Sequence, residues 1–193
     1  MLVLVEGQSD AEAVRALASL VGVDLGAAAI EVRSASGVTN FARELEKFVA
    51  LNPGEAFCGM YDAADEWHVR RALRKAGVPI GAEESPAAYN FFPCCSDLED
   101  ELIRALGAPV VENVLASEGE LASLRRFQAM PEHRDSHVSA QLHRFLGTRA
   151  TRKIRAGRLL TERLDPAGLP LPLQLLAGKL QEAVARAVCP GDA

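Results

Sequence analysis

The sequence predicts an α/β fold, in which a parallel sheet of about four strands is flanked by helices and followed by a helical C-terminal part. Short apolar runs alternate with helical stretches in the first half of the chain, and no strong strand pattern occurs after residue 109. Strand–helix units in succession favour parallel strands joined by crossover helices. With 193 residues, 49% of them apolar, the chain is large enough for one core. We predict an α/β core at residues 1–108 and a helical extension of the same domain at residues 109–193.

The strands are predicted from short apolar runs at residues 2–5, 28–32, 57–61 and 89–95. The first run ends at Glu6 and Gly7, and the third run leads directly into Asp62. The fourth run contains Pro93, which has no N–H to donate to a neighbouring strand. We therefore expect the fourth strand at a sheet edge or next to a bulge.

The helices of the first half are predicted from caps, breakers and apolar periodicity at residues 9–21, 39–51, 66–76 and 96–106. Ser9 with Glu12, and Ser96 with Glu99, are capping-box patterns. The second half is predicted to contain only helices, at about residues 110–117, 119–129, 136–146, 151–163 and 173–188.

Charge and hydropathy exclude several classes of protein. The formal net charge of −5 argues against a protein that coats nucleic acid, but not against a nuclease, whose acidic site is filled by cations. The N-terminus has no basic segment, and no apolar run approaches the roughly 18–20 residues of a membrane span. We expect a cytoplasmic protein with no membrane contact.

Acidic residues follow three of the predicted strands. Glu6, Asp62 and Asp97 lie just beyond the first, third and fourth strands. Ligands of open parallel sheets bind at this carboxyl edge. Carboxylates gathered there would repel one another without a cation, and oxygen ligands without His or Cys suit Mg²⁺ or Mn²⁺. The pattern predicts a divalent metal site.

Each acidic residue also has a purely structural interpretation. Asp10 and Asp97 fall in first helical turns, where the helix dipole favours a carboxylate. Glu99 fits the second position of a capping box, and Asp65 fits a solvated surface. For Glu6 together with Asp62 a functional role is favoured, because a carboxylate at a strand end caps no helix.

A basic segment near the C-terminus predicts contact with a phosphate backbone. Residues 136–160 contain six Lys or Arg residues and no Asp or Glu. The residues predicted to bind nucleic acid are Arg144, Arg149, Arg152, Lys153 and Arg155. A solvated helix face, or pairing with the acidic clusters, is the alternative. Trp67 and His68 follow the third strand's acidic residues, where base stacking or half-buried packing both fit and packing is favoured.

Four motifs in order resemble the TOPRIM domain of OLD-family (overcoming lysogenization defect) ATP-dependent endonucleases. They are LVLVEGQSD at residues 2–10, FCGMYDAADE at 57–66, SDLEDELIRALG at 96–107 and RFLGTRATRK at 144–153. The resemblance spans roughly residues 2–175 and implies a TOPRIM-like, Rossmann-like fold. It also implies a metal-dependent nuclease that hydrolyses DNA phosphodiester bonds with two Mg²⁺ or Mn²⁺ ions.

The resemblance implies a role for each matching residue. Glu6 would bind metal or assist proton transfer, and Asp10 matches the second acidic residue of the first motif. Asp62 matches the first aspartate of an Asp-x-Asp pair. Asp97 and Glu99 would hold a second metal ion. In addition, Lys153 would neutralise charge at the phosphate.

Two departures from the family pattern leave alternatives open. Ala64 replaces the second aspartate of Asp-x-Asp, and Asp65 and Glu66 follow it. The sequence contains no phosphate-binding loop of an ATPase, so a stand-alone TOPRIM protein is expected, whose ATPase is either absent or supplied by a separate subunit. The first hypothesis is a DNA endonuclease, and a homodimer is compatible with the sequence. The alternatives are another TOPRIM phosphotransfer activity, or a non-catalytic or regulatory module acting with that ATPase.

Overall fold

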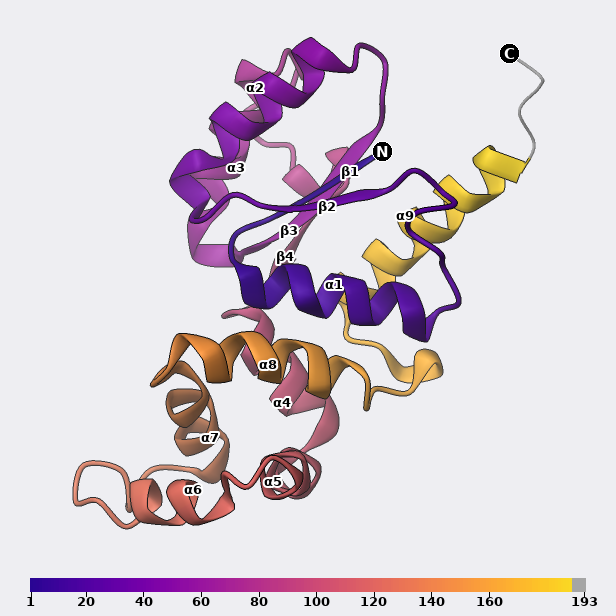
Figure 1. The fold of residues 1–193 in the computed structure, drawn as a ribbon. Helices are drawn as coiled ribbons and strands as arrows, with labels where there is room; N and C mark the ends of the chain where they lie inside the picture. Colours follow the sequence, from indigo (N-terminus) through magenta and orange to yellow (C-terminus); the bar gives the residue numbers. More distant parts are fainter. Residues whose placement is uncertain (189–193) are drawn as a thin grey trace.

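The computed structural model describes residues 1–188; residues 189–193, the end of the predicted helical extension, lie outside the described residues. The chain forms a parallel sheet in the order β2-β1-β3-β4, with helices on both faces (Figure 1). The strands are β1 (Leu2–Val5), β2 (Glu31–Ser34), β3 (Phe57–Asp62) and β4 (Phe91–Cys94). This architecture confirms the predicted fold class.

The strands differ from their predictions mainly at the sheet edges. β1 and β3 lie in the centre of the sheet and match the predicted runs closely. β2 begins at Glu31, three residues later than predicted, because Ala28 and Ile30 fill the core from the preceding turn. β4 is the expected edge strand, and Pro93 is exposed within it.

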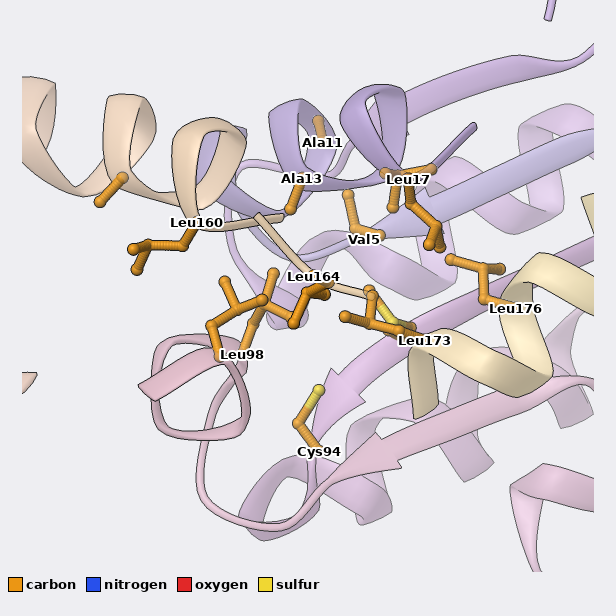
Figure 2. Close-up of a cluster of buried hydrophobic side chains, with 14 of the residues drawn as sticks. Val5, Ala11, Ala13, Leu17, Cys94, Leu98, Leu160, Leu164, Leu173 and Leu176 are labelled. Atoms are coloured by element: carbon orange, nitrogen blue, oxygen red, sulfur yellow. The ribbon is translucent and has the colours of Figure 1, made fainter. Parts of the chain in front are cut away.

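Alternating residues of β1 face two separate cores. Leu2 and Leu4 pack with α2 (Phe41–Leu51) and α3 (Glu66–Lys75). Val3 and Val5 face the larger core on the opposite side, against α1 (Gln8–Leu20) and α9 (Leu171–Val188). Figure 2 shows part of this larger core, where Val5, Leu17, Leu98 and Leu173 meet. The sheet is therefore covered on both faces.

The predicted capping boxes at Ser9 and Ser96 are wrong. In α1 the N-cap is Gly7, whose N–H donates to the Asp10 carboxylate at 2.8 Å. In α4 (Leu98–Leu106) the N-cap is Asp97, which accepts the Asp100 N–H at 2.8 Å. Each helix begins one or two residues away from the predicted position, so a different side chain reaches the free N–H groups.

The helices of the second half lie close to their predicted positions. They are α5 (Ala108–Ser117), α6 (Leu121–Gln128), α7 (Val138–Gly147), α8 (Ala150–Thr161) and α9. In Figure 1, α5, α6 and α7 lie furthest from the sheet, whereas α8 runs alongside α1. Residues 1–188 include no helix with the length and apolar character needed to cross a membrane.

A glycine sets the spacing between α8 and α1. A Cβ atom on Gly157 would lie 2.6 Å from the carbonyl oxygen of Ser9, well inside normal contact. Gly157 therefore allows the two helices to pack closely. Lys153 lies one turn earlier on the same face of α8, so this contact also directs Lys153 towards the N-terminus of α1.

Candidate metal centre

The acidic residues meet where the chain order of the sheet reverses. β1 and β3 are neighbours in the sheet, although β2 lies between them in the sequence. Ligands of open α/β sheets bind at such a point, beyond the carboxyl ends of the strands. Glu6 follows β1, and Asp62 ends β3. The Asp62 N–H donates to Glu6 Oε1 at 3.0 Å, which fixes the two residues side by side.

Asp65 completes a cluster of three carboxylates. After β3 the chain makes one turn of 3-10 helix over Ala63–Asp65 and then begins α3. This turn brings Asp65 back beside Glu6 and Asp62, so that one oxygen from each lies within 4.8 Å of the others. Each of these side chains is half-buried. Asp65 therefore supplies the third carboxylate of the cluster, and Ala64 beside it supplies none.

A second acidic group lies on the α4 side of the site. Glu99 is almost fully buried, and its Oε2 is 3.1 Å from Lys153 Nζ. Its other oxygen, Oε1, has no hydrogen-bond partner among the described residues. A buried carboxylate oxygen left unpaired is costly unless a cation or a water molecule reaches it. Glu99 thus has a free ligand atom, as a metal site requires.

His143 belongs to this region, although sequence reasoning missed it. Asp97 Oδ2 lies 2.5 Å from His143 Nε2, and the other Asp97 oxygen caps α4. His143 comes from α7, 46 residues further along the chain. No local pattern marks it in the sequence, because the contact depends on how α7 packs against α4.

Burial and mutual repulsion shift the titration of the cluster. The pKa of Asp62 is raised to about 7, first by burial and then by the charges of Glu6 and Asp10. Burial also raises the pKa values of Glu6, Asp10 and Glu99. Burial alone would lower the pKa of Lys153, but the carboxylates beside it outweigh that effect and the net shift is upward. The site thus concentrates negative charge around one lysine.

Five of these residues line a single cleft of about 350 Å³, whereas Asp97 and His143 lie outside its lining. Its walls come from the β1–α1 turn, the end of β3, the loop after β2, α4 and the first turns of α8. The lining includes Glu6, Asp10, Asp62, Glu99 and Lys153. The structure therefore brings together five of the sequence-predicted site residues in one cleft, and Asp65 contacts the same cluster.

The basic segment does not form one continuous surface. Arg152 is buried, pairs with Glu120 at 2.7 Å and stacks over Phe145. Arg155 pairs with Glu118 at 3.1 Å and also with Glu120. These two arginines hold α8 to the α5–α6 connection. Both guanidinium groups are thus already paired within the protein.

The remaining basic residues are placed differently. Arg144 and Arg149 are exposed, and neither forms an ion pair within residues 1–188. Arg149 is the N-cap residue of α8 and precedes Ala150, which lines the cleft. The predicted role in binding nucleic acid thus falls on Arg144, Arg149 and Lys153, and it stays a prediction.

Solved structures share this arrangement of elements. The chain aligns with the C-terminal region of the Xanthomonas campestris pv. campestris OLD protein with a TM-score of 0.70 and 20% identity, over 97% of both chains. It aligns with the C-terminal region of the Burkholderia pseudomallei OLD protein with a TM-score of 0.67 and 21% identity, over 95% of this chain and 97% of that one. The chain has the fold of an OLD C-terminal region. No protein-family model and no curated protein matches its sequence.

The OLD-like fold confirms the resemblance noted in the sequence at the level of fold. The residues present also fit a divalent cation. Three carboxylates converge at the reversal point of the sheet, and a fourth, Glu99, carries a buried oxygen without a partner. All of these donors are oxygen atoms, which suit hard cations.

Proposed function

We propose that this protein is a metal-dependent nuclease that hydrolyses DNA phosphodiester bonds with two divalent ions. The convergence of acidic side chains and Lys153 in one cleft is the observation that carries the proposal. A cluster this acidic has little stability of its own at neutral pH, so a cationic ligand explains its presence. The OLD-like fold supports the same assignment through the motifs that match at these positions.

The residues divide into two groups of candidate ligands. Glu6, Asp62 and Asp65 would hold one Mg²⁺ or Mn²⁺ ion, because their oxygens already converge. Asp10, Asp97 and Glu99 would hold the second ion from the α1 and α4 side. Bound divalent ions would supply positive charge to the phosphoryl and leaving oxygens of the scissile phosphate.

The chain's own groups would orient the substrate and manage protons. Lys153 Nζ is held by Glu99 and would place a fixed positive charge beside the phosphate. Glu6 is held by the Asp62 N–H, so its free oxygen keeps a constant position for ligation or proton transfer. His143 orients Asp97, since the imidazole bonds the oxygen that does not cap α4.

Nicking of supercoiled plasmid DNA tests the proposal. We expect the purified protein to nick the plasmid in Mn²⁺ or Mg²⁺ and to lose nicking in EDTA. Glu6→Gln and Asp62→Asn should each reduce the rate at least about hundredfold, because each removes a charge that the metal requires. Glu83→Gln is the matched control; Glu83 is exposed outside the cleft and should leave the rate unchanged.

The competing proposal is a non-catalytic module that works with a separate ATPase. It is favoured by Ala64, which departs from the family's metal-binding pair. Protein that cuts DNA in neither metal, alone or with a candidate ATPase, would contradict the nuclease proposal and support this one. Nicking that persists in both Glu6→Gln and Asp62→Asn would show that the cleft is not the active site.

A further inference from the structure

Trp67 lies on the surface of the protein and not in its core. It is the single tryptophan of the chain, and it is 57% exposed to solvent. It lies in the first turn of α3, two residues after Asp65 of the acidic cluster. The packing role favoured from the sequence is therefore not observed. Exposed tryptophans are enriched at binding surfaces, because the indole ring supplies a large contact area at low entropic cost.

The indole lies against the imidazole of the next residue in the sequence. The ring centroids of Trp67 and His68 are 3.8 Å apart, with 36° between the ring planes. His68 itself is half-buried. The indole therefore contacts a half-buried imidazole and presents its remaining surface to solvent.

The turn between Asp62 and the helix of the indole contains two small residues. Asp62 ends β3, and only Ala63, Ala64 and Asp65 precede the helix that carries Trp67. Both alanines are exposed. No bulky side chain therefore stands on this turn between Asp62 and the indole. Its carboxylates are Asp65 of the cluster and Glu66, which pairs with Arg70.

The face of α3 that carries Trp67 also carries two arginines. Arg71 and Arg74 lie four and seven residues after Trp67, which places all three side chains on one face of the helix. Arg71 is exposed and forms no ion pair within the described part of the chain. By contrast, Arg70 lies off this face and neutralises Glu66 at 2.7 Å. The backbone of Arg71 lies about 6 Å further along the helix axis than that of Trp67.

We propose that Trp67 and Arg71 form a platform that binds single-stranded nucleic acid and leads it into the acidic cleft. An unpaired base would stack on the indole, and Arg71 would contact a phosphate of the same strand. A base inside a duplex presents only its edges in the grooves, whereas an unpaired base offers the face that an aromatic ring needs. The part of this proposal that concerns cleavage rests on the proposed function, but the binding part does not.

Tryptophan fluorescence tests the platform directly, because the chain has no other tryptophan. The probe is an oligothymidylate of about 15 nucleotides, within the usual range of single-strand sites. The titration is carried out in Ca²⁺, which makes a divalent ion available to the cleft in place of the proposed Mg²⁺ or Mn²⁺. We expect saturable quenching of the Trp67 emission by the oligothymidylate, and at least about tenfold weaker binding of a duplex of the same length.

Variants separate base stacking from electrostatic attraction to the phosphate backbone. Anisotropy of a labelled oligothymidylate should show about tenfold weaker binding for Trp67→Ala, and Trp67→Phe should restore most of the affinity because phenylalanine also stacks. Arg71→Ala should weaken binding and reduce its salt dependence. The matched controls are Leu51→Ala and Arg163→Ala, which alter an exposed apolar and an exposed basic residue on other elements.

Several results would overturn the platform. These are an oligothymidylate that does not bind, one that binds without changing the Trp67 emission, and a Trp67→Ala variant that binds it as tightly as the parent protein. Quenching without any DNA cleavage would remove the proposed hydrolysis and keep the platform. Plasmid nicking together with unchanged Trp67 emission at saturating oligothymidylate would keep the hydrolysis and remove the platform.

Discussion

At the scale of single residues, Asp62 shows most clearly how the site lowers the stability of the folded protein. Its pKa is raised to about 7 in the folded chain from an ordinary value of 3.8, chiefly by burial. The folded state therefore binds a proton between about pH 4 and 7 that the unfolded state has already released. The contribution of Asp62 to the free energy of unfolding therefore falls as the pH rises through that window. Above pH 7 the full cost of an ionised Asp62 is present.

We predict that Asp62→Asn stabilises the metal-free protein. In urea unfolding at pH 8 with EDTA, the variant should exceed the parent by about 1–2 kcal/mol in free energy of unfolding, after allowance for screening by solvent. The difference should shrink towards zero as the pH falls to 4. Asp135→Asn is the control, because Asp135 has a side chain that is 88% exposed. A variant less stable than the parent at pH 8 would contradict this account of the cleft.

At the scale of secondary-structure elements, the contact between α8 and α1 positions Lys153, the one lysine among the described residues that line the cleft. Arg152 and Arg155 hold α8 to the α5–α6 connection, so Lys153 between them faces the opposite way, towards Glu99. Local sequence predicted the existence of α8 and its basic character. It could not predict which of these cations are paired, because their partners lie more than 30 residues away.

Gly157→Ala should separate α8 from α1. The new Cβ would lie 2.6 Å from the Ser9 carbonyl oxygen, so one helix must move. We expect a loss of about 1–3 kcal/mol in urea unfolding, as for other overpacked contacts, and weaker divalent-metal binding by titration calorimetry. The control is Gly178→Ala in α9, where the added Cβ meets open space. That control should gain up to about 1 kcal/mol from helix propensity. Equal stability of Gly157→Ala and the parent would argue against a tight helix contact.

At the scale of the whole molecule, the sequence predicted what is encoded locally. Apolar runs that end in acidic residues located β1 and β3, and parallel topology then placed Glu6 and Asp62 at one edge. Contacts between elements far apart in the chain could not be predicted from the sequence. The pairing of His143 with Asp97 and the burial of Arg152 both depend on tertiary packing. The predicted division at residue 108 stays a prediction, since α8 and α9 pack back onto the α/β part.

We propose that the carboxylates at the sheet reversal hold divalent metal. A crystal soaked in Mn²⁺, measured for anomalous scattering, tests it most directly. We predict one anomalous peak ligated by Glu6, Asp62 and Asp65, and a second between Asp10, Asp97 and Glu99. A soaked crystal of Asp62→Asn should lose the first peak and serves as the control. Splayed carboxylates with no anomalous peak in the cleft at saturating Mn²⁺ would contradict the claim.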